Sequence, residues 1–181
     1  MKYIRIPKDR VGVLIGKDGE TKKTIERISQ MHLEIDSEEG DVAFNEQEAK
    51  DPLIPLKVED IIRAIGRGFS PEHAFRLFGE ETELFIFDIY DYISKKESHL
   101  ARVKSRVIGR EGKTKRVIEG LTGGFLAVYG HTVAVIADFE SMDIAKKALD
   151  MLLSGSEHPT VYRFLEREMK KFHLSRHSRH E

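Results

Sequence analysis

The chain has 181 residues, of which 40% are hydrophobic and 34% charged, and its formal net charge is −1. This composition is typical of a globular protein, and no window of about 20 uninterrupted apolar residues is present to span a membrane. The absence of cysteine excludes a disulfide framework and thiolate metal sites. Residues 1–5 lack the apolar core of a secretory signal, so we expect a cytoplasmic protein without a membrane partner.

Hydrophobic periodicity and the positions of glycine and proline predict the elements of the first half. In chain order these are a strand at 3–6, helices at 10–15 and 21–29, strands at 31–36 and 41–44, and helices at 56–67 and 71–78. The second half is predicted to follow the same order, with a strand at 84–87, helices at 99–108 and 113–121, strands at 124–129 and 132–137, and helices at 141–153 and 159–172. Residues 173–181 show no apolar periodicity and are predicted to form a disordered basic tail.

A string of twelve residues occurs twice, as Ile15–Glu26 and as Ile108–Glu119, with the shared pattern I-G-x-x-G-x-T-K-[KR]-x-I-E. The copies are 93 residues apart. Later landmarks, Gly68 and Gly155, are only 87 apart, so the first half carries six extra residues (93 − 87 = 6). Self-similarity at this long period indicates two copies of one fold rather than a solenoid. The sequence therefore predicts domains at 1–79 and 80–172.

Charge is distributed unevenly between the two halves. Residues 31–60 contain ten acids and two lysines, a balance of −8, whereas residues 95–120 contain nine bases and three acids, a balance of +6. A polyanion would be steered toward the second half, because each phosphate that is neutralised there releases counterions.

The paired glycines predict a loop that meets phosphates. Gly16 and Gly19, like Gly109 and Gly112, let the backbone approach an anion without a Cβ in the way, and the helix that follows points free N–H groups at the same place. The spacing fits neither a Walker A loop nor a dinucleotide fingerprint. A single G-x-x-G is also a common tight turn between helices. The first copy, flanked by acids, could be such a turn without a ligand.

No catalytic or metal site is predicted. The eight histidines are scattered, no nucleophile lies beside a base, and no metal-ligand spacing is present. The acids of residues 34–41 could supply a nuclease metal cluster, but they surround a predicted turn, where solvated charge is far commoner. The aromatic run 84–87 could stack on bases, although its alternation favours core packing.

The order strand, helix, G-x-x-G, helix, strand, strand, helix resembles the type I KH domain (βααββα), present here twice. The resemblance implies an α+β fold in which each domain is a three-stranded sheet with helices on one face. In that family the loop clamps about four single-stranded nucleotides beside an apolar groove. Carried over by position, it implies that RNA is bound by Arg102, Arg106, Ile108, Gly109, Arg110, Glu111, Gly112, Lys113, Lys115, Arg116, Phe125, Leu126, Ala127 and Val128. A second candidate RNA site comprises Gly16, Lys17, Asp18, Gly19, Lys22 and Lys23.

One departure narrows the resemblance. KH domains usually place an aliphatic residue where both copies here have a lysine, Lys22 and Lys115. With the G-K-T-K-R-x-I-E string and the closing run 160–163, the chain is similar to the Dim-two or partner-of-Nob-one family of small-subunit ribosomal RNA processing. An intact first loop suggests an archaeal member. The resemblance implies single-stranded RNA near the 3′ end of that rRNA and the alpha subunit of translation initiation factor two as partners, and allows a processing endonuclease as a third.

The sequence thus predicts a non-enzymatic, single-stranded RNA-binding protein of ribosome biogenesis, without a cofactor. Its second domain is the expected main reader of RNA. An alternative remains open, in which the KH folds are docking surfaces of a protein-interaction adaptor and RNA binding is secondary.

Overall fold

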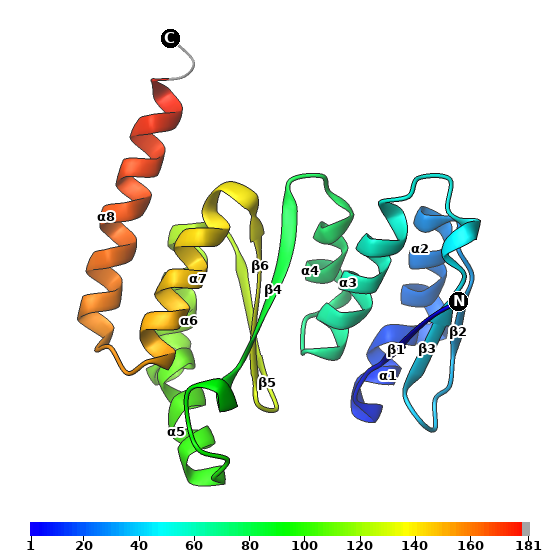
Figure 1. The fold of residues 1–181 in the computed structure, drawn as a ribbon, viewed down its shortest axis with the longest axis horizontal. Helices are drawn as coiled ribbons and strands as arrows, with labels where there is room; N and C mark the ends of the chain where they lie inside the picture. The colour runs from blue at the N-terminus through cyan, green and yellow to red at the C-terminus, as the bar shows by residue number, and fades with distance from the viewer. Residues whose placement is uncertain (179–181) are drawn as a thin grey trace. The chain divides into compact units, whose positions relative to one another are not determined.

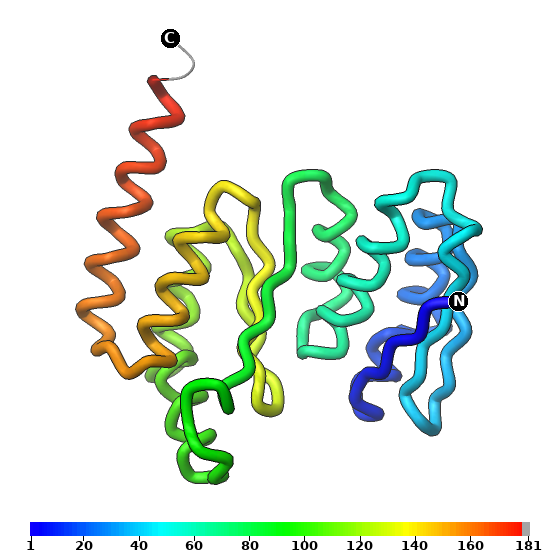
Figure 2. Tube along the Cα trace, viewed as in Figure 1, coloured from blue at the N-terminus to red at the C-terminus, as the bar shows by residue number. Residues whose placement is uncertain are grey.

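The structure, a computed structural model, describes residues 1–178 and divides the chain into two compact units, Met1–Thr82 and Glu83–Glu181. This division lies within a few residues of the predicted boundary. Figure 1 shows the elements of each unit, and Figure 2 traces the chain through them.

The first unit contains a three-stranded sheet with the strand order β1-β3-β2. Its elements are β1 (Lys2–Arg5), α1 (Lys8–Ile15), α2 (Glu20–Ser29), β2 (Leu33–Ile35), β3 (Asp41–Phe44), α3 (Ile54–Gly66) and α4 (Pro71–Ala74). Both strand pairs are antiparallel. Pro7 precedes α1 and Gly16 follows it, as the sequence predicts. The predicted helix at 71–78 is α4 followed by a 3-10 turn at Phe75–Phe78.

The second unit repeats this order, with a sheet in the order β4-β6-β5. Its elements are β4 (Thr82–Asp88), α5 (Glu97–Ile108), α6 (Lys113–Thr122), β5 (Phe125–Tyr129), β6 (Thr132–Asp138), α7 (Phe139–Leu153) and α8 (His158–His177). The strands β5 and β6 are antiparallel, and Leu126 lies opposite Val135. Two α+β units with the predicted βααββα order are therefore confirmed.

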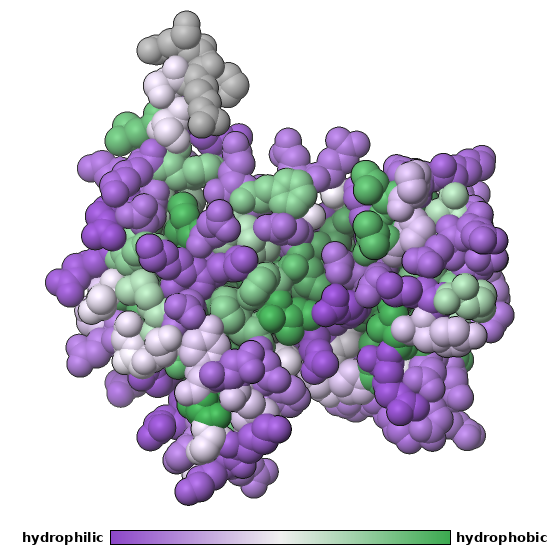
Figure 3. Space-filling model, viewed as in Figure 1, coloured by the Kyte–Doolittle hydropathy of each residue, from purple (hydrophilic) through white to green (hydrophobic). Residues whose placement is uncertain are grey.

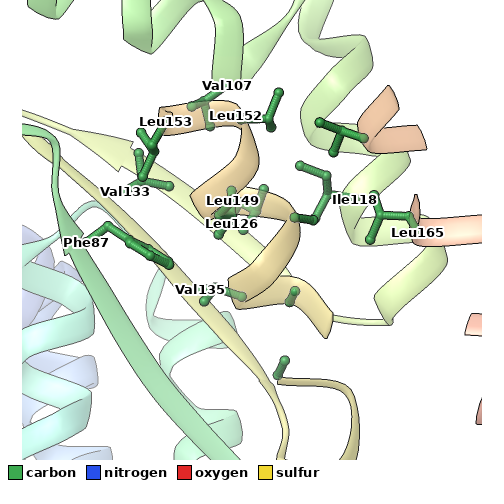
Figure 4. Packing of buried hydrophobic residues seen from close by; sticks show 14 of the residues in the cluster. Phe87, Val107, Ile118, Leu126, Val133, Val135, Leu149, Leu152, Leu153 and Leu165 are labelled. Carbon is green, nitrogen blue, oxygen red and sulfur yellow. The ribbon is translucent and has the colours of Figure 1, made fainter. Parts of the chain in front are cut away.

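The core of the second unit lies between its sheet and its helices (Figure 4). Alternate residues of β6, Val133 and Val135, point into it beside Leu126 of β5, and they meet Ile118 of α6 and Leu149 of α7. Each buried side chain of this kind contributes about 1.5–3 kcal/mol relative to exposure. Hydrophilic residues cover most of the surface that Figure 3 shows, with smaller hydrophobic areas among them. Residues on both faces of β6 are buried, and those of one face, Val133 and Val135, pack against the helices.

The last helix is longer than the sequence predicts. α8 continues to His177, so the prediction of a disordered tail from residue 173 is wrong for residues 173–177, and residues 179–181 lie outside the described part. The last turns of α8 contact its neighbour, because Arg176 lies 3.6 Å from Glu140 at the start of α7; within α8, the guanidinium of Arg176 lies over the ring of Phe172. The ion pair with α7 is a tertiary contact and is not visible in local periodicity.

Candidate nucleic-acid interface

The two G-x-x-G loops have the same backbone conformation. The first glycines, Gly16 and Gly109, have φ/ψ of 76/170° and 77/171°, and the second, Gly19 and Gly112, have 75/15° and 73/16°. Between them, Asp18 and Glu111 adopt left-handed geometry with φ of 53° and 52°. Non-glycine residues rarely do so, at a cost of about 1–2 kcal/mol. The repeat thus specifies one strained loop twice.

The first glycine of each loop admits no side chain. A Cβ on Gly16 would lie 2.3 Å from Oγ1 of Thr21, and a Cβ on Gly109 would lie 2.3 Å from Oγ1 of Thr114. A φ near +77° with ψ near 170° is also a region that essentially only glycine adopts. Each threonine of the motif therefore fills the space beneath its glycine. The second glycine, Gly112, is required by its positive φ and not by crowding, because its Cβ would meet only the flexible end of Arg116 at 3.2 Å.

Each loop leads into a helix whose N-cap is glycine, so the first amides of α2 and α6 lack a side-chain cap. The N–H groups of Glu20 and Lys113 already donate within their loops, to the carbonyls of Lys17 and Arg110. The positive end of the helix dipole still makes such a terminus favourable for an anion. Residues Lys17 and Arg110 are exposed beside it, next to Asp18 and Glu111. Binding of a phosphate at either loop stays a prediction.

The motif's basic positions have separate tasks. Lys23 donates from Nζ to the carbonyl of Asp18 at 2.9 Å, and Arg116 donates in the same way to the carbonyl of Glu111. These cations brace the loops. The preceding lysine points elsewhere, because Lys115 Nζ lies 3.9 Å from Glu119, and Lys22 and Glu26 of the first unit form the same pair at 3.9 Å. This pairing accounts for lysine where the KH family usually has an aliphatic residue.

The closing glutamate of the motif ties α6 to the edge strand. Glu119 Oε1 accepts the backbone N–H of Leu126 at 2.8 Å, and Glu26 Oε1 accepts that of Leu33 at 2.8 Å. Because β5 is at an edge of its sheet, alternate amides face away from β6. The amide of Val128, two residues after Leu126, therefore faces the same open edge. The N–H and C=O groups of Val128 therefore lie at the open edge of β5.

The predicted strand residues divide into two groups. Leu126 is buried in the core under the helices, Ala127 is buried on the opposite face of the sheet, and Phe125 and Val128 are half-buried. Ile108 ends α5 directly before the loop and is also half-buried. Contact of these five residues with RNA stays a prediction.

Two predicted groove residues lie elsewhere. Arg102 and Arg106 line a hollow of about 330 Å³ with Tyr92 and the end of α7, and no β5 residue lines it. Arg106 also donates through Nη2 to the carbonyl of Ser156. We interpret Arg106 as a residue that holds the start of α8, and a direct role of either arginine in RNA contact stays a prediction.

Sequence reasoning missed a brace behind the second loop. Tyr162 of α8 hydrogen-bonds through its hydroxyl to Thr114 Oγ1 at 2.8 Å, which is the threonine beneath Gly109. One turn earlier, His158 Nε2 lies 2.8 Å from the carbonyl of Arg106. α8 packs on α6 and α7. Contacts between residues nearly fifty positions apart leave no signal in a single sequence.

The turn between β5 and β6 is held by a side-chain cluster. His131 Nδ1 lies 2.9 Å from Asp88 Oδ1, and the His131 ring stacks on Tyr90 with 5.0 Å between centroids. Burial raises the pKa of Asp88, but the N–H of Tyr90 and the His131 ring lower it more, so the pKa lies below its ordinary value. The cluster fixes the end of the edge strand.

The first loop borders a hollow of about 480 Å³ with mixed charge. Lys17, Lys23 and Arg27 line it together with Asp18 and Glu20. The second candidate RNA site therefore has cations at the loop, but the acids beside them would weaken the binding of a phosphate.

Neither a metal-binding cluster nor a membrane-spanning helix is found among the described residues. Within residues 1–178, no group of three or more histidine, cysteine or carboxylate side chains could hold a metal ion. The acids considered for a nuclease have other partners: Asp41 pairs with Arg5 at 2.8 Å, and Asp36 accepts the N–H groups of Glu38 and Glu39. Among the same residues, no helix combines the length and apolar character that a membrane crossing requires.

Known proteins share both units. The family model "Eukaryotic type KH-domain (KH-domain type I)" matches residues 83–170, and the model "KH domain" matches residues 1–50. A KH domain-containing protein of Methanocaldococcus jannaschii is 49% identical over 176 residues, which cover 97% of this chain and 77% of that protein. The RNA-binding protein PNO1 of Oryzias latipes is 31% identical over 118 residues, covering 64% of this chain and 48% of that protein.

The crystal structure of Dim2p from Pyrococcus horikoshii has a TM-score of 0.84 and 48% identity, covering 92% of this chain and 98% of that one. The chain belongs to the Dim2/PNO1 family of KH-domain proteins.

Dim2p from Pyrococcus horikoshii is also known in a complex with a/eIF2alpha and rRNA, and this structure matches with a TM-score of 0.86, 48% identity and 94% coverage of each chain. The chain spans about half the length of the eukaryotic PNO1 proteins that it matches. The resemblance to a Dim2/PNO1 protein, drawn from the repeated motif and its lysine, is confirmed.

Proposed function

We propose that this Dim2/PNO1 protein is a non-enzymatic, cytoplasmic protein that binds single-stranded RNA near the 3′ end of small-subunit rRNA during ribosome maturation. The observation that carries the proposal is the second loop, a bare main chain at the start of α6 with basic side chains around it. The Pyrococcus Dim2p complex with rRNA and the name of PNO1 as an RNA-binding protein support the choice of ligand.

Binding would proceed on two surfaces that meet at the loop. The sugar-phosphate backbone lies against Gly109–Gly112, where the positive end of the α6 dipole favours it. The bases lie toward β5, where the open N–H and C=O groups of Val128 are suited to hydrogen bonds with base edges. A KH loop of this kind clamps about four nucleotides. Unpaired RNA fits because its base edges are free.

Basic side chains of α6 would set the salt dependence of binding. Lys113 and Arg116 are exposed at the start of the helix, and Lys115 is shared with Glu119. Each cation that neutralises a phosphate contributes about 0.7 to the slope of log K against log salt for a single strand. Replacing Lys113 or Arg116 by alanine should therefore lower the slope by about that amount, and replacing Lys115 should lower it less.

Gly112 is the site for a decisive test because a side chain there avoids the collision that would occur at Gly109. Gly112→Asp would place a negative charge beside a seated phosphate, and two like charges about 5 Å apart repel by about 1–3 kcal/mol at an effective dielectric between those of water and protein. Gly112→Asn is the matched control: asparagine tolerates the left-handed conformation and has nearly the same shape. We expect the aspartate variant to bind a short unpaired RNA far more weakly than the asparagine variant. Equal binding by both would contradict an anion seat.

The first unit supports a second role as a protein-docking domain. Its loop is flanked by carboxylates, and residues 31–60 carry a balance of −8. We propose contact with the alpha subunit of translation initiation factor two, as in the Pyrococcus complex. Co-sedimentation of the purified subunits tests this. Incubating labelled RNA with the protein and Mg²⁺ tests the absence of nuclease activity, and intact RNA is the expected result.

A further inference from the structure

The first unit has a connection that the second unit lacks. In the second unit β6 ends at Asp138 and α7 begins at Phe139, whereas in the first unit residues 45–53 separate β3 from α3. Most of the six extra residues of the first half lie here, and the rest lengthen the turn between β2 and β3. The G-x-x-G loop does not include this connection, so we consider which ligand the surface of residues 45–53 could bind.

Hydrogen bonds hold the connection in one conformation. Asn45 Oδ1 accepts the N–H of Gln47 at 3.1 Å, and Glu48 Oε2 accepts the N–H of His32 at 2.9 Å, which ties the segment to the start of β2. Asp51 Oδ1 accepts the N–H of Leu53 at 2.9 Å, directly before α3. The segment is therefore a fixed part of the unit.

Two leucines project from the end of this segment. Leu53 is 58% exposed and Leu56 is 54% exposed, while Pro55 and Val58 between and after them are buried and anchor α3. Residues three apart at a helix start lie on the same side. Single exposed leucines are ordinary. Here two neighbours share one rigid site, which we call the Leu53–Leu56 surface.

Acidic residues flank Leu53 and Leu56 in the sequence. Residues 46–60 contain five acids and two lysines, a balance of −3. Glu46, Glu48 and Asp51 are exposed. Three other side chains of this range have partners: Lys57 Nζ donates to the carbonyl of Phe78 at 2.9 Å, Glu59 lies 3.0 Å from Lys2, and Asp60 lies 3.9 Å from Arg63. A ligand at this surface therefore meets negative charge around an apolar centre.

We propose that the Leu53–Leu56 surface is a docking site for a basic segment of a partner protein that inserts apolar side chains between the leucines. Apolar contact would supply affinity and the carboxylates would favour lysine or arginine at the rim. RNA is a poor occupant because its phosphates would face Glu46, Glu48 and Asp51. The small area is suited to a transient contact that adds to others.

The test uses synthetic helical peptides and the methyl signals of Leu53 and Leu56 in the full chain. The probe peptide carries two leucines among lysines, a second peptide has serines in place of the leucines, and a third has glutamates in place of the lysines. We expect the probe peptide alone to shift both methyl signals. The double variant Leu53→Ser, Leu56→Ser should weaken its binding by about tenfold or more. Leu174→Ser, an equally exposed leucine on α8, should leave binding unchanged.

Other outcomes would overturn the proposal. Equal shifts with the serine peptide would show that charge alone attracts the probe, and equal affinity of the double variant would place the contact elsewhere. Shifts of these methyl groups by an unpaired oligonucleotide would make the surface an RNA site. Self-association of the wild-type chain that the double variant abolishes would make it an interface between two copies. Both leucines are exposed, so the variants should keep the wild-type melting temperature.

Discussion

Replacing Glu119 by alanine should release the edge strand of the second unit from α6. The carboxylate accepts the N–H of Leu126 at 2.8 Å, and its other contact is with Lys115 at 3.9 Å. A hydrogen bond to a charged group contributes about 1.5–3 kcal/mol, and a partly exposed i,i+4 ion pair adds only about 0.3–0.5 kcal/mol. We therefore expect local opening at Leu126 to become easier by about 2 kcal/mol, which corresponds to roughly 30-fold faster amide exchange.

Hydrogen exchange of individual amides measures this effect directly. Glu119→Gln keeps an acceptor without the charge and should show a smaller change, while Lys115→Ala should leave the Leu126 amide nearly as protected as in the wild type. The amide of Ala127 faces β6 and serves as the internal control. Affinity for unpaired RNA should fall in parallel, because the hydrogen bond from Leu126 to Glu119 also positions β5 beside α6. Unchanged exchange at Leu126 in Glu119→Ala would refute the reasoning.

Three further changes test other parts of the account. Tyr162→Phe leaves the buried hydroxyl of Thr114 without its 2.8 Å partner, so we expect a loss of about 1–2 kcal/mol in unfolding free energy and weaker RNA binding. Both quantities can be measured on one preparation. Full RNA affinity of the variant would show that α8 does not brace the loop. Gly120→Ala, where a Cβ meets open space in α6, should raise stability by about 0.5–1 kcal/mol. Gly109→Ala should destabilise the fold by about 3 kcal/mol or more, because its Cβ would collide with Thr114. Equal melting temperatures of the two variants would contradict this collision. The pKa of Asp88 is lowered in the folded chain, so the ionised carboxylate stabilises the fold above the ordinary pKa of 3.8, and this stabilisation is lost as the pH falls through and below that value. The difference in melting temperature between the wild type and Asp88→Asn should therefore vanish on acidification. A difference that stays constant with pH would rule out the titration of Asp88 as its source.

The repeated motif made much of the fold predictable. Ile25 and Ile118 are fully buried, as a helical stripe requires, and the glycines of both loops adopt the positive φ that their turn requires. Local patterns of period two and 3.6 located the strands and helices because burial of one face imposes those periods. The family resemblance followed from the same residues.

What the sequence could not supply is the set of partners across space. In the sequence Glu119 looks like a surface acid, but in the fold its carboxylate accepts the N–H of Leu126 in β5. Arg106 reads as a groove cation, yet the start of α8 takes up its guanidinium. The end of α8 forms an ion pair with α7. Each of these contacts is set by topology, which a single periodic pattern does not encode.

The central claim is tested most directly by following the amide signals of the full chain while a short unpaired oligonucleotide from the 3′ end of small-subunit rRNA is added. The account predicts that the signals of Gly109–Gly112 move first and furthest, together with that of Val128, and that those of Gly16–Gly19 move less. Signals of the second loop that stay in place while RNA binds elsewhere would contradict it.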